Sequence, residues 1–141
     1  MSLVQALLLP VFLHVLLTTW VGVHSVRARI KSVVGGETRL KDIALDNEAW
    51  PKRITQLGNN FDNQFQVPVV WYACLALLLV TGLADWIAVI LSWAFLATRV
   101  AHTIVHTGSN HVPSRMKVYL AGFGTVFLMW TWFALRLYVI G

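Results

Sequence analysis

Four apolar segments, each close to the length of a membrane span, dominate the pattern of hydrophobic and polar positions. They run from about Leu3 to Val26, Val67 to Leu83, Trp86 to Val105 and Lys117 to Tyr138. A bilayer core requires roughly 20 predominantly apolar residues per helix, so each segment predicts a transmembrane helix. Only residues 81–85 separate the second segment from the third, which makes these two helices antiparallel neighbours.

A polar stretch precedes the second apolar segment and extends its helix. Proline is tolerated in the first turn of a helix, so Pro51 predicts a helix from about residue 52 to 83, kinked at Pro68. The other helices are expected at about residues 3–26, 86–108 and 114–139. We therefore expect residues 1–141 to form one all-α domain, a polytopic membrane protein built as a four-helix bundle.

Ionisable side chains interrupt the third segment. Arg99, His102, His106 and Asn110 fall within about 80 degrees of arc on a helix, so they form a single narrow stripe. Ionisable groups at membrane depth are costly and mark functional sites by default. The stripe must face other protein or a hydrated cavity, because lipid would leave the arginine unpaired.

A second polar stripe lies in the lead-in to the second span, on one face with Asn60. It contains Arg53, Gln56, Asn60, Asn63 and Gln64. Both stripes lie in the same half of the bundle, so they predict one shared pocket. The alternative is an interfacial turn whose amides are solvated; Asn63 and Gln64, closer to the hydrocarbon, favour the site.

Composition and charge agree with a membrane location. Hydrophobic residues make up 57% of the chain and charged residues 12%, against roughly 25% charged in soluble domains. The net charge of +5 comes from basic residues beside apolar spans, where headgroup attraction explains them, so we expect no nucleic-acid partner.

The basic residues also predict the topology. Seven lie in the connection between the first two spans: Arg27, Arg29, Lys31, Arg39, Lys41, Lys52 and Arg53. Arg115 and Lys117 lie in the connection between the last two, and only Arg136 lies near the other side. Positive residues favour the cytoplasmic side, so both connections are expected in the cytoplasm and both termini outside.

A metal or haem site is not expected. His102 and His106 are four residues apart, a spacing that suits a metal, but the third span contains no aspartate or glutamate to complete a ligand set. Cys74 lies in an apolar run, which is typical of an inert buried thiol. The two arginine-bearing stripes instead match an anionic peptide, because guanidinium forks bind carboxylates and amides bind peptide groups. The adjacent bilayer makes a lipophilic second substrate reasonable.

The stretch from Arg99 to Tyr119 (RVAHTIVHTGSNHVPSRMKVY) resembles the third helix and following turn of the MAPEG family, the membrane-associated proteins in eicosanoid and glutathione metabolism. The resemblance covers nearly the whole chain and includes the bacterial branch of the family. It implies a homotrimer of four-helix subunits in a bacterial inner membrane, with glutathione bound between neighbouring subunits as thiol co-substrate.

The resemblance also implies roles for individual residues. Arg27 matches an arginine at the end of the first helix that reaches glutathione. Arg99, His102 and Arg115 match pocket residues, and Arg115 aligns with the arginine that stabilises the thiolate. Tyr119 matches a tyrosine that lies against glutathione.

The second helix departs from the family's Asn-x-x-Glu motif. Aligning Asn60 with the motif's asparagine places Asn63 at the glutamate position, and aligning Pro68 with the family's proline places Gln64 there. Either way, a neutral amide replaces the carboxylate that would pair with the ammonium of glutathione. Losing one partner of a buried charge pair can cost about 3–5 kcal/mol, so we expect weaker glutathione binding.

Two functions follow from these residues. The first is a glutathione-dependent transferase or peroxidase acting on lipophilic electrophiles or hydroperoxides, with Arg115 stabilising the thiolate and His106 as hydrogen-bond donor or general acid. The second is a non-catalytic MAPEG-like protein that binds a lipid or a membrane protein partner. His106 and Met116, which stand where the resemblance implies tyrosine and serine, favour the second.

Overall fold

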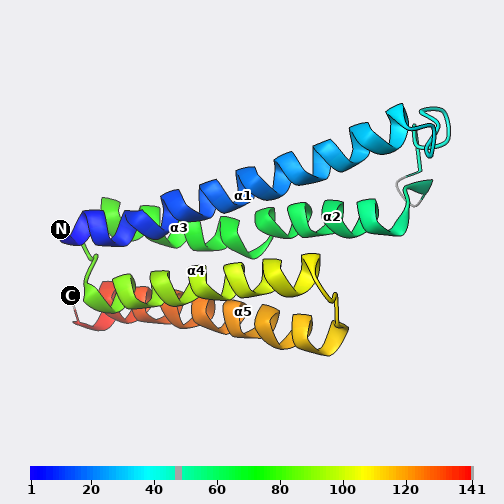
Figure 1. Ribbon diagram of the computed structural model, residues 1–141. Coiled ribbons are helices and arrows are strands. Elements are labelled where there is room, and N and C mark those ends of the chain that lie inside the picture. Colours follow the sequence, from blue (N-terminus) through cyan, green and yellow to red (C-terminus); the bar gives the residue numbers. More distant parts are fainter. Residues whose placement is uncertain (47–48, 141) are drawn as a thin grey trace.

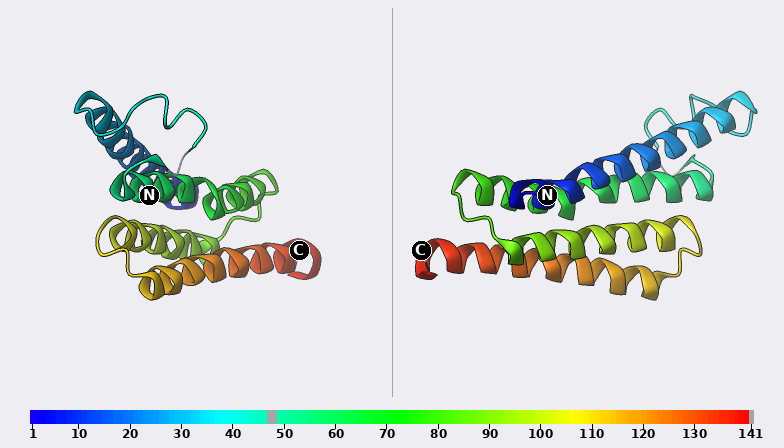
Figure 2. Two further views of the ribbon diagram at one scale, coloured as in Figure 1. Left: turned by 90° about the vertical axis from the view of Figure 1, so that its right-hand side faces the viewer. Right: turned by 60° about the vertical axis from the view of Figure 1, so that its left-hand side comes forward.

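The computed structural model describes residues 1–46 and 49–140, and those residues form four helical rods lying side by side (Figure 1). Four helical stretches are long and apolar enough to cross a membrane: Leu3–Val34, Lys52–Val80, Trp86–Thr107 and Val112–Ile140. The predicted all-α architecture with four spans is confirmed. Both termini and the α3–α4 link lie at one end, and the other two connections lie at the opposite end (Figures 1 and 2).

The rods contain seven helical elements in chain order. They are α1 (Leu3–Val34), α2 (Lys52–Asp62), the 3-10 turn η2 (Asn63–Phe65), α3 (Val67–Val80), α4 (Trp86–Thr107), α5 (Val112–Leu135) and the π-helical turn η3 (Arg136–Ile140). Within the described residues, α4 packs against α5 and α1, while α2 packs against α1 and α4. The second rod thus lies beside α4, which brings the two polar stripes together.

The first helix continues to Val34 and does not end near Val26, where the apolar run stops. The charges mark the end of the membrane-compatible segment, but arginine and lysine are good helix formers, so the helix itself persists. Its extension is also packed, because the Arg29 guanidinium carbon lies 5.3 Å from the centroid of the Trp50 ring. Ser2 begins the helix with a reciprocal capping box to Gln5.

The second rod breaks earlier than the expected kink at Pro68. The α-helix ends at Asp62, a 3-10 turn follows, and Gln66 leaves helical geometry with φ −86° and ψ −93°. Pro68 lies in the first turn of α3. The proline ring would clash with the carbonyl of Gln64 in a continuous α-helix, so the chain opens before the proline and not at it.

A glycine turn and a side-chain cap set the end of α3 and the start of α4. The helix α3 ends at Val80, short of residue 83, where Gly82 adopts φ +70° and Leu83 donates its backbone N–H to the Leu78 carbonyl. Asp85 then caps α4 through the backbone N–H of Ala88 at 2.9 Å.

The apolar core fills the half of the bundle near the termini. Its fully buried members come from all four rods and include Leu7, Trp71, Cys74, Leu78, Phe95 and Met129. The pocket-forming polar residues occupy the other half. The bundle therefore separates a packed apolar end from a polar end.

Candidate functional site

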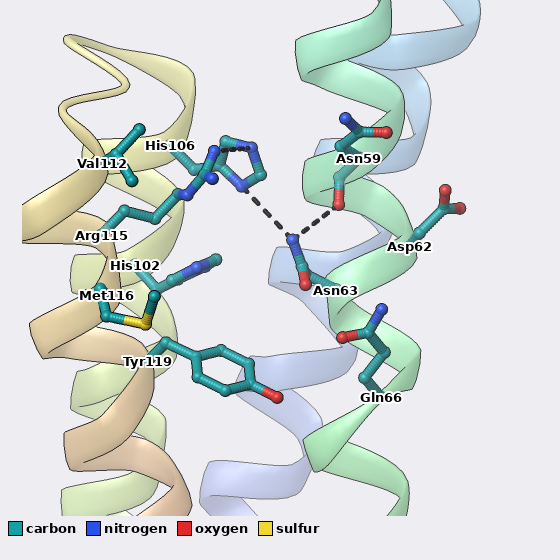
Figure 3. Close-up of a pocket in the computed structure, with 10 residues that line it drawn as sticks. All are labelled: Asn59, Asp62, Asn63, Gln66, His102, His106, Val112, Arg115, Met116 and Tyr119. Atoms are coloured by element: carbon teal, nitrogen blue, oxygen red, sulfur yellow. Dashed lines mark hydrogen bonds between the residues drawn. The ribbon is translucent and has the colours of Figure 1, made fainter. Parts of the chain in front are cut away.

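A polar cavity of about 410 Å³ separates the second rod from the α4–α5 pair (Figure 3). Its lining residues are Asn59, Asp62, Asn63, Gln66, His102, His106, Val112, Arg115, Met116 and Tyr119. Four of them come from the stretch around the α2–η2 break, and the other six come from α4 and α5. The cavity therefore joins the two polar stripes that the sequence places in one half of the bundle.

Arg115 and His106 form the part of the cavity's α4–α5 wall nearest the connection between these helices (Figure 3). Nη1 of Arg115 donates to Oδ1 of Asn110 at 2.7 Å and lies 3.2 Å from Nε2 of His106. A guanidinium only donates, so Nε2 of His106 is the acceptor. Asn110 adopts a left-handed φ of 50°, a conformation that asparagine tolerates, and its side chain thereby accepts from Arg115 on the following helix.

Asn63 faces this pair from the second rod. Its Nδ2 atom donates to the Asn59 carbonyl at 2.8 Å and lies 3.5 Å from Nδ1 of His106. Because Nε2 accepts from Arg115, Nδ1 carries the proton of a neutral ring, so this approach to Asn63 is a contact between two donors. Figure 3 shows the resulting row of side chains running from Arg115 through His106 to Asn63 across the cavity. A ligand in the part of the cavity between this row and Tyr119 would meet the guanidinium, an imidazole and an amide together.

His102 and Tyr119 form the lower part of the wall. The His102 ring centroid lies 5.4 Å from that of His106 and 6.2 Å from that of Tyr119. Figure 3 shows the Tyr119 ring reaching from α5 toward the second rod. The tyrosine therefore offers both an aromatic face and a hydroxyl to a bound molecule.

Arg99 is not among the residues that line the cavity; its guanidinium lies against the Tyr119 ring. The guanidinium carbon lies 5.7 Å from the centroid of that ring, and the side chain is 1% exposed. Its Nε and Nη2 atoms have no partner among the described residues. A buried charge without a carboxylate requires an anion, ordered water or aromatic faces, and Phe95 supplies a second face at 5.2 Å.

Asn60 and Gln64, both predicted site residues, point away from the cavity. Gln64 is 2% exposed and donates to the Thr103 hydroxyl and the Asn60 carbonyl, each at 3.2 Å. Asn60 is fully buried, and neither of its side-chain polar atoms has a partner within the described part of the chain. Of the second-helix candidates, only Asn63 lines the cavity.

Arg53 and Arg27 also lie outside this cavity in the single chain. Arg53 donates to Gln56 and to the Thr107 carbonyl, where its charge meets the negative end of the α4 dipole. Arg27 is exposed on α1 and borders a separate depression with Phe61 and Phe65. These two arginines therefore do not join the cavity through contacts within one subunit.

The sequence reading missed Asn59, Asp62 and Gln66. Together with Asn63 they form an i, i+3, i+4, i+7 pattern, which was present in the sequence as a second polar face. The helical period favoured the face of Asn60, because Arg53, Gln56 and Gln64 group around it. Periodicity does not decide between two polar faces; packing buries Asn60 and Gln64 and leaves the other face lining the cavity.

The histidines do not assemble a metal-ligand set in the described part of the chain. No group of three His, Cys, Asp or Glu side chains there is placed to hold a metal ion. Cys74 is a fully buried free cysteine in the apolar core. The polar chemistry of the site rests on arginine, imidazole, amides, one tyrosine and one aspartate.

Comparison with known proteins assigns the fold to a family. No curated protein and no solved structure matches the chain at a significant level. A model of the MAPEG family, however, matches residues 7–135, which include most of all four membrane-spanning rods. The expected resemblance is thereby confirmed, and the chain belongs to the MAPEG family of integral membrane proteins.

Proposed function

We propose that this protein is a glutathione-dependent transferase or peroxidase acting on lipophilic electrophiles or hydroperoxides. The observation that carries the proposal is the position of Arg115 in the cavity. Its guanidinium is held by the Asn110 amide and the His106 ring and has no carboxylate partner among the described residues. An arginine fixed in this way is free to bind an anion.

The cavity fits glutathione in size and in chemistry. Its volume of about 410 Å³ lies within the range of small-molecule sites, roughly 300–1,000 Å³. The amides of Asn59, Asn63 and Gln66 match the peptide groups of a tripeptide. Arg115, with Arg99 buried against the Tyr119 ring, supplies positive charge for carboxylates and a thiolate.

Bound glutathione would supply a thiol whose ordinary pKa is about 8.5 and which a neighbouring cation shifts toward the thiolate. Arg115 is the cation in this proposal. His106 holds Arg115 by accepting its hydrogen bond, and the ring nitrogen that carries the proton serves as hydrogen-bond donor or general acid. His102 and Tyr119 line the space beside this pair.

The lipophilic substrate would enter from the bilayer. Val112 and Met116 line the cavity and are 55% and 53% exposed, so they give its mouth an apolar border. Electrophiles dissolved among membrane lipids would reach the thiolate across these two side chains. The polar remainder of the cavity would keep glutathione in place.

A homotrimer and a defined topology complete the proposal. Arg27, Arg53, Asn60 and Gln64 do not line the cavity of the single chain, so Arg27 would reach glutathione only across an interface with a neighbouring subunit. The connections rich in lysine and arginine lie at the cavity end, which would face the cytoplasm of a bacterial inner membrane. The molar mass of the detergent-purified protein tests the trimer.

The function is tested by titrating reduced glutathione into the detergent-purified full chain. We expect saturable binding, with Arg115→Ala weakening it at least about tenfold. Lys117→Ala is the matched control, because it removes an exposed positive charge two residues away that does not line the cavity. Turnover of a chlorodinitrobenzene or an organic hydroperoxide, lost in the Arg115 variant, would establish catalysis; absence of binding up to millimolar glutathione would refute the proposal.

A non-catalytic lipid-binding role is the second candidate. An apolar depression of about 570 Å³ lies between α1 and α3, bordered by side chains such as Val11, Tyr72 and Leu79. Met116 lines the polar cavity where the family resemblance implies a serine. Glutathione-independent co-purification of a lipid, together with no turnover, would favour this role over the enzyme.

A further inference from the structure

A small pocket lies where α1, α2 and α4 meet, at the end of the bundle that carries the basic connections (Figure 1). Its volume is about 200 Å³, and its lining residues are Trp20, Val21, His24, Arg53, Leu57 and Thr107. None of them lines the polar cavity, so this pocket is separate from the proposed glutathione site. In the described part of the chain no aspartate or glutamate lines the pocket, which leaves it with the positive charge of Arg53.

Arg53 is anchored through only one of its nitrogen atoms. Nη1 donates to Oε1 of Gln56 at 3.1 Å and to the backbone carbonyl of Thr107, which uses both of its hydrogens. Nε and Nη2 have no hydrogen-bond partner among residues 1–46 and 49–140, and the guanidinium has no ion pair there. These two atoms form the edge of a guanidinium that binds two oxygens of a phosphate or carboxylate at once. The anchored side chain therefore has an unused anion-binding edge.

Trp20 and His24 form the α1 wall of the pocket. Their ring centroids are 4.4 Å apart, and Nδ1 of His24 donates to the Trp20 carbonyl at 3.3 Å. Nε2 is therefore the ring nitrogen left for a ligand, and it accepts from a hydroxyl when the ring is neutral and donates to an anion when the ring is protonated. Val21 and Leu57 are buried and add apolar side chains to the lining. The pocket thus combines an anion-binding group with an apolar surface.

The position of the pocket indicates which anion it meets. Trp20 and His24 lie in the last two turns of the apolar segment of α1, just before Arg27, while Arg53 lies in the first turn of α2 and Thr107 ends α4. Tryptophan and basic residues at the ends of spans lie at the level of the lipid headgroups, and basic pockets between helices at this level bind lipid phosphates. The pocket is smaller than the roughly 300–1,000 Å³ of a site for a drug-sized molecule, so it suits a compact group such as phosphate.

We propose that this pocket binds the phosphate group of an anionic phospholipid from the surrounding bilayer. Arg53 holds two phosphate oxygens through Nε and Nη2, and His24 contacts the headgroup through Nε2. The Trp20 ring, with the apolar lining, packs against the glycerol and the first acyl carbons. The inference goes beyond the proposed function, because it requires neither glutathione nor turnover. It assigns Arg53 a role within one chain, apart from any contact with glutathione across subunits.

The test titrates three probes calorimetrically into the detergent-purified full chain: dihexanoyl-phosphatidylglycerol, dihexanoylglycerol, which has the same acyl chains without phosphate, and inorganic phosphate. We expect saturable binding of the phosphatidylglycerol, with the other two probes at least about tenfold weaker. Arg53→Gln should weaken phosphatidylglycerol binding at least about tenfold, and Arg53→Lys, which keeps the charge without the two-atom edge, should lose part of the affinity. Lys52→Gln is the matched control, because it removes a neighbouring exposed charge that does not line the pocket.

Three results would overturn the proposal. Equal affinity for the phosphatidylglycerol and dihexanoylglycerol would show that phosphate is not recognised, and undiminished binding by Arg53→Gln would show that Arg53 does not hold it. Inorganic phosphate that binds as tightly as the phosphatidylglycerol would exclude the lipid as the source of the phosphate. Thermal unfolding separates a lost site from misfolding, since Arg53→Lys can still donate to the Thr107 carbonyl and should unfold near the wild-type midpoint. Failure of this inference would leave the proposed function intact, because the two sites share no lining residue.

Discussion

Gly122 and Arg99 are packed so closely that a β-carbon on the glycine would lie 2.5 Å from Nη2 of the arginine. The same β-carbon would lie 2.7 Å from Oγ1 of Thr98, which is itself held by the Phe95 carbonyl at 2.7 Å. The glycine on α5 therefore provides the space that lets α4 bury a guanidinium. Two adjacent side chains would have to move to admit even one methyl group.

Gly122→Ala should destabilise the protein because of this contact. Overpacking in a filled interior costs about 1–3 kcal/mol, which exceeds the roughly 1 kcal/mol that alanine gains over glycine in a helix. Gly124→Ala is the matched control, since nothing lies within 4 Å of its added β-carbon and only the helical gain remains. Thermal unfolding in detergent should place the Gly122 variant below the control; equal midpoints would show that Arg99 shifts freely.

Arg99→Met should weaken glutathione binding without lowering the stability of the protein. The buried guanidinium has no carboxylate partner among the described residues, so replacing it with an apolar side chain of similar length removes an uncompensated charge. Buried charges replaced by packed apolar groups often leave stability unchanged or raise it by about 1–4 kcal/mol. We expect an equal or higher unfolding midpoint and at least about tenfold weaker glutathione binding. A clear loss of stability would show that the Phe95 and Tyr119 rings already compensate the Arg99 charge.

The four spans were predictable because a membrane-spanning helix can be recognised from the length of its apolar run alone. A run of apolar residues near the bilayer thickness indicates a span without knowledge of any contact, and a helix long and apolar enough to cross a membrane is present at all four runs. The end of α1 was not predictable in the same way. Arg27 ends the apolar run but not the helix, which continues through Arg29 and Lys31 to Val34.

The site was predictable where the helix is regular. On the unbroken α4, the 3.6-residue period correctly groups His102 and His106 on the cavity face and places Arg99 nearby. On the second rod, two polar faces have the same helical period, one with Asn60 and Gln64 and one with Asn59, Asp62, Asn63 and Gln66. The period does not decide between them; packing buries Asn60 and Gln64 and leaves the other face lining the cavity. The roles of Arg27 and Arg53 remain predictions, because they depend on a neighbouring subunit.

Asp85 couples α4 to α5 at the end of the bundle far from the cavity. It caps α4 through Ala88, accepts from Nε1 of Trp132 at 2.9 Å and lies 3.9 Å from Nη1 of Arg136. Losing a cap costs about 0.5–2 kcal/mol, so Asp85→Ala should lower the unfolding midpoint without changing glutathione affinity. Asp85→Asn, which still caps a helix, should lower it less. A change in affinity in either variant would show that the two ends of the bundle are coupled.

Tyr72 and His14 form a polar contact inside the apolar half of the bundle. The Tyr72 hydroxyl and Nδ1 of His14 are 2.6 Å apart, and His14 is fully buried beside the Trp71 and Phe95 rings. Tyr72→Phe keeps the ring but removes the hydroxyl, so Nδ1 retains only a marginal contact of 3.5 Å to Thr18.

Leaving a buried polar group without its partner costs about 1–3 kcal/mol, so Tyr72→Phe should unfold at a lower temperature than the wild-type chain. Tyr138→Phe is the control, because Tyr138 is 83% exposed and its hydroxyl makes no hydrogen bond to the described residues. The double variant Tyr72→Phe with His14→Phe should recover part of the loss, since it removes both polar partners together. If the double variant is less stable than the sum of the single changes, the two side chains contribute through packing and not through their hydrogen bond.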